Sequence, residues 1–144
     1  MRHAPRALVA TLAAVTALAA CTSGIPKHRG QAPERERYAA YAGEPLDRMV
    51  WLGHYDGWES IGDNQLVVFT TPNDAYLLKV TPPCTDLPFV DTIGLTATGG
   101  AVYSRLDSVK VKRWHCPIAE IRRIDYKRMR ADLRAEAEQG KSTG

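Results

Sequence analysis

This sequence of 144 residues is poor in the features that mark a metal centre or a membrane span. It contains three cysteines, Cys21, Cys84 and Cys116, and none of them belongs to the CxxC spacing that is typical of a zinc site. Its longest apolar run covers residues 8–20, which is shorter than the roughly 20 residues that a membrane-spanning helix needs. The sequence therefore predicts no permanent transmembrane helix, and it points to no metal ion or other cofactor.

An excess of one charge is also missing. The formal net charge at pH 7 is +3, and Arg2 and Arg6 supply two of the positive charges. A nucleic-acid-binding domain usually carries a basic patch or stripe, and no such stripe runs through this chain. We expect no nucleic-acid partner.

The first 21 residues have the layout of an export signal. Arg2, His3 and Arg6 precede the apolar run and small residues end it, which is typical of a secretory signal peptide over residues 1–20. Leu18-Ala19-Ala20-Cys21 resembles the lipobox of bacterial lipoproteins. This resemblance implies cleavage before Cys21, a diacylglycerol on the Cys21 sulfur and an acyl chain such as palmitate on its new amino group. Two or three acyl chains make membrane attachment effectively permanent.

Residues 21–42 are expected to form the lipidated cysteine and a flexible tether. Gly, Pro and charged residues dominate positions 22–37, and such a composition buries too little apolar surface to order a chain. A short helical turn is expected near Tyr38 and Tyr41. Thr22 stands where an Asp would resemble an inner-membrane retention signal. We therefore expect a protein of the bacterial cell envelope, anchored in the outer membrane and facing the periplasm, with simple secretion as the alternative.

Assigning Cys21 to lipid leaves Cys84 and Cys116 as the two other thiols. Exported proteins fold in an oxidising compartment, so these two cysteines are predicted to form one disulfide. The alternative is a metal site that also uses the neighbouring His115. That site would lack a fourth ligand in the sequence.

Period-2 alternation of apolar residues predicts β-strands in the middle of the chain. The clearest pair is residues 65–71 and 75–81, separated by the turn residues Pro72-Asn73-Asp74. In the second of these strands Tyr76, Leu78 and Val80 share one face, while Leu77 and Lys79 share the other.

The rest of residues 43–130 continues this pattern. Gly99-Gly100 predicts the turn of a second hairpin, over residues 92–106. Val109 and Val111 alternate with lysines. Further short strands are expected at residues 47–52 and 118–123. The predicted fold is therefore mainly β, a small antiparallel barrel or sandwich with a C-terminal α-helix.

The C-terminal helix is expected to start after Asp125, which can cap it, and to end at Gly140. Residues 131–144 would then hold the helix end and a disordered tail. This region is rich in cations, each of which is attracted to an anionic membrane by about 1 kcal/mol. The candidate contacts to an anionic surface are Arg122, Arg123, Lys127, Arg128 and Arg130, and Arg134 continues the run. The alternative is a solvated helix with internal pairs such as Arg134 with Glu138.

One long segment carries a family resemblance. Residues 58–125 contain "LVVFTTPNDAYLL", then Cys84-Thr85-Asp86-Leu87, then Ser108-Val109 with Cys116 and Ile118. This set resembles the core of a family of small lipoproteins from Gram-negative bacteria that has no known function. The resemblance supports the limits of the domain and the pairing of its cysteines, and it supplies no catalytic residue.

Three other groups of residues each allow a functional and a structural interpretation. Acidic residues could bind a cation or simply form turns, aromatic side chains could line a ligand groove or pack the core, and two histidines lack a nucleophile nearby. The groupings are Asp56, Glu59, Asp63 and Asn64; Trp51, Tyr55, Trp58, Tyr76 and Trp114; and His54 and His115.

These observations predict a non-enzymatic envelope lipoprotein. Its β domain would act as a binding or interaction module that the N-terminal lipid holds on the membrane. The expected partner is an envelope protein. The alternative is an accessory or inhibitor subunit of an envelope enzyme complex. No constellation in the sequence supports catalysis.

Overall fold

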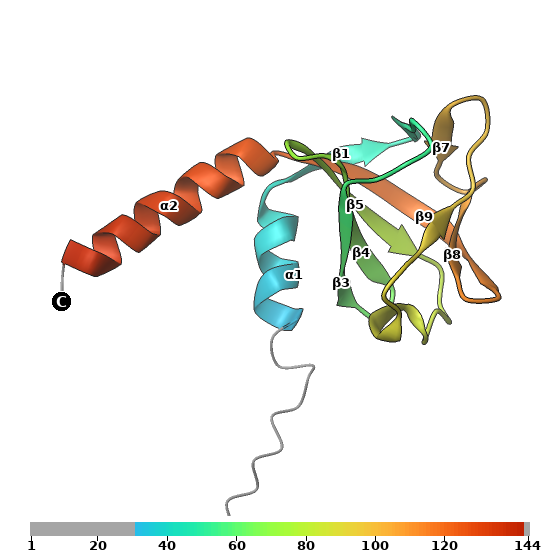
Figure 1. Ribbon diagram of the computed structural model, residues 1–144, viewed down its shortest axis with the longest axis horizontal. Helices are drawn as coiled ribbons and strands as arrows, with labels where there is room; N and C mark the ends of the chain where they lie inside the picture. Colours follow the sequence, from blue (N-terminus) through green and yellow to red (C-terminus); the bar gives the residue numbers. More distant parts are fainter. Residues whose placement is uncertain (1–30, 143–144) are drawn as a thin grey trace, which may run out of the picture.

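The computed structural model describes residues 31–142 as a curled antiparallel sheet accompanied by two helices (Figure 1). The elements are α1 (Gln31–Ala40), β1 (Ala42–Leu46), β2 (Arg48–Val50), β3 (Gly57–Gly62), β4 (Gln65–Thr71), β5 (Asp74–Val80), the 3-10 helix η1 (Leu87–Phe89), β6 (Gly94–Leu95), β7 (Ala101–Tyr103), β8 (Ser108–Val111), β9 (Trp114–Ile124) and α2 (Tyr126–Ser142). The predicted signal peptide and Cys21 lie outside the described residues.

Seven strands of this region form one sheet, in the order β3-β4-β5-β9-β8-β6 with β1 also paired to β9. β2 and β7 pair with each other in a separate two-stranded sheet. The large sheet curls into a half barrel (Figure 1). The prediction of a mainly β fold with a C-terminal helix is confirmed.

β9 is the strand that connects most of the sheet. It pairs with β5 along one edge and with β8 and β1 along the other. A β-bulge near Ala119 shifts the register between β9 and β5. Because of this shift, Cys116 and Ile118 before the bulge and Ile121 after it all belong to the same apolar core.

Apolar side chains pack on both faces of the sheet. The inner cluster fills the curl, and its fully buried members include Met49, Leu66, Val68, Leu78, Leu87, Val102, Val109 and Ile121. The outer cluster joins the sheet to the two helices, and its buried members are Tyr38, Ile61, Val67, Ala75, Ile124 and Met129. Both faces of β4 are therefore covered, which explains its continuous apolar run.

The hairpin predicted first is present as β4 and β5, with Leu66 paired to Leu78 and Val68 to Tyr76. Val109 and Val111 of β8 are buried, as their alternation predicts.

The second predicted hairpin is wrong beyond its turn. Thr98 and Ala101 do form a bridge around Gly99-Gly100. The flanking segments then separate, since β6 pairs with β8 and β7 pairs with β2. Leu106 is 67% exposed because it lies in a turn after β7 and does not continue the strand.

The N-terminal helix is longer than the sequence predicts. The sequence predicts a flexible tether over residues 21–42 with a short helical turn near Tyr38 and Tyr41, but α1 is a helix of ten residues. Its anchor is Tyr38, which is 7% exposed within the outer cluster and donates a hydrogen bond to Glu59 of β3 over 2.7 Å. One buried aromatic side chain with a satisfied hydroxyl thus holds a helix whose composition is otherwise polar.

Helix α2 begins as predicted, because the Asp125 carboxylate accepts a hydrogen bond from the Arg128 amide. It passes through Gly140 and continues to Ser142, so the predicted end at Gly140 is wrong. A glycine at the exposed end of a helix weakens it without forcing it to stop. Among residues 31–142, no helix is both long and apolar enough to cross a bilayer.

The contact between Tyr38 and Glu59 predicts a loss of stability at alkaline pH. Burial, the hydrogen bond to Glu59 and the charge of Glu59 raise the pKa of Tyr38 above its usual range. An unfolded tyrosine loses its proton near pH 10, whereas folded Tyr38 keeps it, so the free energy of unfolding should fall as the pH rises above about 10. Urea unfolding at a series of pH values should show a weaker decline for Tyr38→Phe, together with a loss of about 1 kcal/mol at neutral pH. Equal declines for both proteins would contradict this role.

Candidate functional site

A disulfide joins Cys84, in the loop after β5, to Cys116 of β9, with the two Cα atoms 5.9 Å apart. The predicted pair is thus present in the structure. The alternative metal site is wrong, because the two sulfur atoms are bonded to each other and His115 is exposed. In the region from residue 31 to residue 142, no three His, Cys, Asp or Glu side chains are grouped to hold a metal ion.

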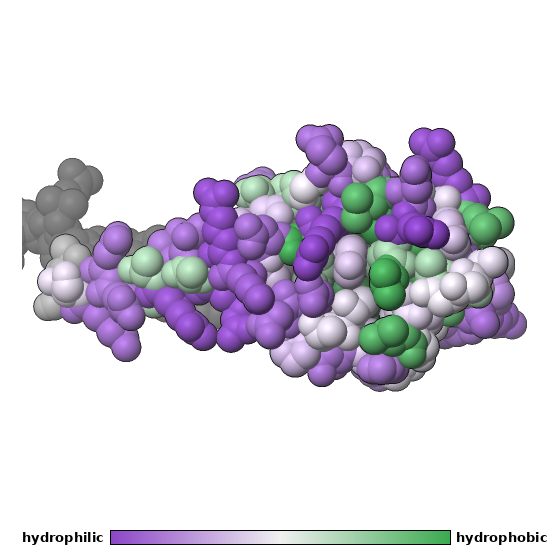
Figure 2. Space-filling model, turned by 90° about the horizontal axis from the view of Figure 1, so that it is seen from above, coloured by the Kyte–Doolittle hydropathy of each residue, from purple (hydrophilic) through white to green (hydrophobic). Residues whose placement is uncertain are grey.

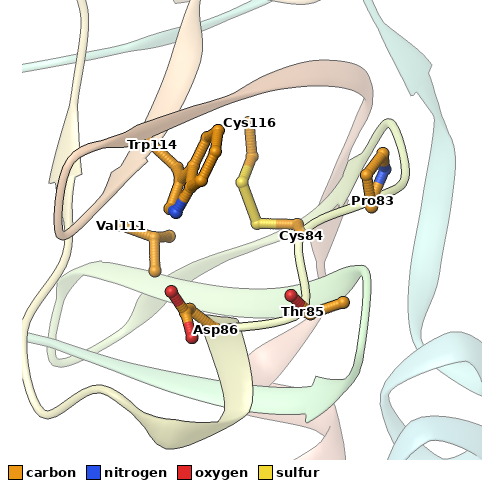
Figure 3. A pocket seen from close by; sticks show the side chains of 7 residues that line it. All are labelled: Pro83, Cys84, Thr85, Asp86, Val111, Trp114 and Cys116. Atoms are coloured by element: carbon orange, nitrogen blue, oxygen red, sulfur yellow. A yellow bond between two sulfur atoms is a disulfide. The ribbon is translucent and has the colours of Figure 1, made fainter.

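A cavity of about 100 Å³ lies beside this disulfide (Figure 3). Its lining is mostly apolar and comes from three segments: the loop after β5, the end of β8 and the start of β9. The lining residues are Pro83, Cys84, Thr85, Asp86, Val111, Trp114 and Cys116. We call this feature the Trp114 cavity.

Strand geometry places Trp114 at the cavity. Trp114 and Cys116 are two residues apart in β9, so their side chains point to the same face. Val111 is the register partner of Trp114 across the β8–β9 hairpin and therefore also shares this face. Val111 and Cys116 are buried, whereas Trp114 is 61% exposed. The indole thus lies on the same face as the buried Val111 and Cys116, and it stands at the surface beside the disulfide (Figure 3).

One ion pair lies near the Trp114 cavity. The Lys112 ammonium is 3.4 Å from the Asp86 carboxylate, and both side chains are substantially exposed. Lys112 belongs to the two-residue turn between β8 and β9, and Asp86 lines the cavity. Such an exposed pair contributes little stability, but it places a charge of each sign next to an apolar hollow.

The other aromatic side chains mostly pack instead of lining a groove. Trp51, Tyr55, Trp58 and Tyr76 are partly buried against the inner cluster. Tyr55 donates its hydroxyl to the carbonyl of Ile93, and the Trp58 indole donates to the carbonyl of Asp91. Trp114 is the member of the predicted aromatic set that projects from the surface.

The predicted cationic residues divide into two groups. Lys127, Arg130 and Arg134 of α2, together with Asn73 of the β4–β5 turn, line a shallow hollow of about 220 Å³. We call these three cations the basic face. A neighbouring hollow of about 450 Å³ shares Asn73 and Lys127 and includes Arg123.

The remaining predicted cations have acidic partners. Arg123 pairs with Asp74 of β5, and the guanidinium, through this hydrogen bond and its charge, lowers the pKa of Asp74. Arg122 lies 2.6 Å from Glu120 and lowers the pKa of that carboxyl in the same way. Arg128 pairs with Asp132 one helical turn away. These three residues are therefore partly neutralised.

The acidic cluster begins at Asp56, just before β3, and continues through β3 into the turn after it. Asp63 and Asn64 form the turn between β3 and β4, as the structural reading predicts. Glu59 lies within β3 and accepts the Tyr38 hydroxyl. His54 and His115 are both exposed and lie in different segments.

Sequence reasoning missed the Trp114 cavity as a unit. The signal was available in the alternation across the β8–β9 turn, which puts Val111, Trp114 and Cys116 on one face. The contributions of Pro83, Thr85 and Asp86 carried no such signal, because they lie in an irregular loop that tertiary contacts, the disulfide among them, bring to β9.

Comparison with known protein families shows that a family of unknown function, DUF6491, matches residues 4–140 of the chain. No curated protein and no solved structure matches the chain.

The disulfide should be a major source of stability. It joins residues 32 positions apart, and the chain-entropy model gives about 3–4 kcal/mol for a loop of this size. We expect the double substitution Cys84→Ser and Cys116→Ser to lower the free energy of unfolding by that amount in urea titrations. Dithiothreitol should destabilise the wild type equally and leave the double variant unchanged. Equal stability of the two oxidised proteins would contradict this expectation.

Proposed function

The chain belongs to the DUF6491 family of unknown function, and we propose that it is a lipid-anchored protein of the bacterial envelope whose β domain is a non-enzymatic binding module. The anchor is Cys21, and the proposed location is the outer membrane, facing the periplasm. This part of the proposal is supported by the basic start, the apolar run of residues 8–20 and Leu18-Ala19-Ala20-Cys21.

The observation that carries the binding role is the exposed Trp114 beside an apolar cavity. Tryptophan is enriched among the residues that dominate binding energy at protein interfaces. The cavity of about 100 Å³ matches one branched aliphatic side chain, and its disulfide floor keeps its walls in place. The proposed partner is therefore an envelope protein that inserts an apolar side chain next to Trp114. If that partner is an enzyme, the chain is its accessory or inhibitor subunit.

The lipid anchor is tested by metabolic labelling with palmitate. We expect wild-type protein to incorporate the label and Cys21→Ser to incorporate none, because the thioether needs the Cys21 sulfur. Cys84→Ser is the matched control and should remain labelled. Mass spectrometry of the N-terminal peptide should place the modification on Cys21. Equal labelling of the wild type and Cys21→Ser would contradict the anchor.

The binding role is tested by photocrosslinking in intact cells. A benzoylphenylalanine residue at Thr85, on the rim of the Trp114 cavity, should yield one discrete crosslinked protein. The same residue at Glu36, exposed on α1, should not.

Trp114→Ala should reduce the yield of that crosslink by about tenfold or more, as expected for a residue that dominates an interface. Leu106→Ala is the matched control, because Leu106 is similarly exposed, at 67% against 61%, but does not line the cavity. The binding role is wrong if the crosslink survives Trp114→Ala or disappears equally with Leu106→Ala.

A further inference from the structure

Helix α2 leaves the sheet soon after it starts. Met129 is buried in the outer cluster, and Leu133 is partly buried against the same cluster. Every residue from Arg134 to Ser142 is exposed. In Figure 1 the helix projects away from the sheet, and in Figure 2 the projecting part is covered mainly by hydrophilic side chains. Only the first one or two turns of α2 therefore pack on the sheet, and most of this long helix faces solvent.

Charges of opposite sign occupy different sides of this helix. Lys127, Arg130 and Arg134 follow each other at intervals of three and four, and Lys141 follows Arg134 at an interval of seven, so all four lie on one side. At about 100° per residue, Asp132 and Glu136 lie roughly 160° away from the middle of that line. Glu138 is the carboxylate of α2 that lies beside the basic line.

The cations of the basic face form no ion pair within the described part of the domain. The ion pairs of residues 31–142 involve Lys112, Arg122, Arg123 and Arg128, and none involves Lys127, Arg130 or Arg134. The Arg130 guanidinium lies 5.7 Å from the centre of the Tyr126 ring, which orients it and leaves its charge in place.

We propose that the basic face, extended by Lys141, lies against an anionic phospholipid bilayer. From Lys127 to Lys141 the line of cations covers about 20 Å of straight helix, which suits a flat surface of many phosphates better than one small anion. The hollow beside Asn73 is shallow and open, so a small anion placed there would stay largely in contact with solvent. Each cation that reaches such a surface raises the partition coefficient by about fivefold.

The proposed contact of the basic face with a bilayer agrees with the proposed lipid anchor at Cys21. In this respect the inference rests on the proposed function. Helices α1 and α2 both pack on the outer face of the sheet. The chain between Cys21 and the start of α1 at Gln31 reaches at most roughly 35 Å. A lipid on Cys21 would therefore keep α2 close to headgroups and raise their effective concentration at the basic face.

The test measures the acetylation of individual lysines by mass spectrometry. Full-length protein, purified from membranes, is reconstituted into vesicles of phosphatidylcholine alone or with one third phosphatidylglycerol. We expect acetylation of Lys127 to slow by about threefold or more on the anionic vesicles. Lys110, exposed on β8, is the internal control and should react equally on both. The inference is overturned if both lysines change equally or neither changes.

A pair of double variants shows whether the slowing comes from the basic face. Arg130→Gln with Arg134→Gln should abolish it, because two neighbouring charges are lost. Lys79→Gln with Arg113→Gln removes the same number of positive charges from β5 and the β8–β9 turn and should leave the slowing intact. If both double variants behave alike, net charge is responsible and the basic face is not the contact.

Two further conditions test whether the surface on the basic face is the bilayer, and they distinguish this contact from attachment through the lipid anchor. At 1 M salt, where the Debye length is about 3 Å, Lys127 should become reactive while the protein stays on the vesicles. Release of the protein at this step would instead refute the lipid anchor and leave the low-salt result on the face standing. Soluble polyphosphate, added with neutral vesicles, should not protect Lys127. Equal protection by polyphosphate would overturn the bilayer as the occupant.

Discussion

The pairing of β9 along both of its edges is the constraint on which the rest of this structure depends. β5 occupies one edge, and β8 and β1 share the other, so the strand connects both halves of the sheet. Its register also fixes the positions of the Trp114 cavity and of the start of α2. Trp114 and Cys116 lie at its start, beside the cavity, and Ile124 at its end leads through Asp125 into α2. A shift of one residue in β9 would turn these side chains to the opposite face.

The disulfide and the bulge adapt this strand to two different cores. Cys116 ties the start of β9 to Cys84, in the loop after β5. The bulge near Ala119 keeps Ile118 and Ile121 in the inner cluster, although they are three residues apart. Ile124 then falls on the outer face, where it joins Tyr38 and Met129. The same strand thus supports the inner core and the attachment of both helices.

Much of the fold could be predicted from the sequence where the apolar pattern is local. The β4–β5 hairpin and β8 follow from alternation and turn residues, and the cap at Asp125 follows from its side chain. The pattern failed where tertiary partners decide. β3 lies among residues that are typical of turns. The segments on either side of Gly99-Gly100 pair with different strands. Helix α1 is held by the burial of Tyr38. The bulge near Ala119 has no sequence signal that we can name.

The candidate sites show the same division. The cysteine pair could be predicted because assigning Cys21 to lipid leaves two thiols. The cavity beside the disulfide could be predicted only from the register of the β8–β9 hairpin. The run of cations was visible as composition, whereas its division requires the positions of Asp74, Glu120 and Asp132. Those carboxylates pair with Arg123, Arg122 and Arg128 and leave Lys127 and Arg130 with Arg134 on the basic face.

Native-state hydrogen exchange of the full chain tests most directly whether β9 unites the sheet with the base of α2 and leaves the rest of that helix free. The amides of Ile118, Ile121 and Met129 should exchange only through global unfolding, because these residues are buried and their backbone is paired or helical. Amides beyond Leu133 should exchange much faster, through local opening of the exposed helix. Slow exchange along the whole of α2, or fast exchange in β9 while β4 and β5 remain protected, would contradict this account.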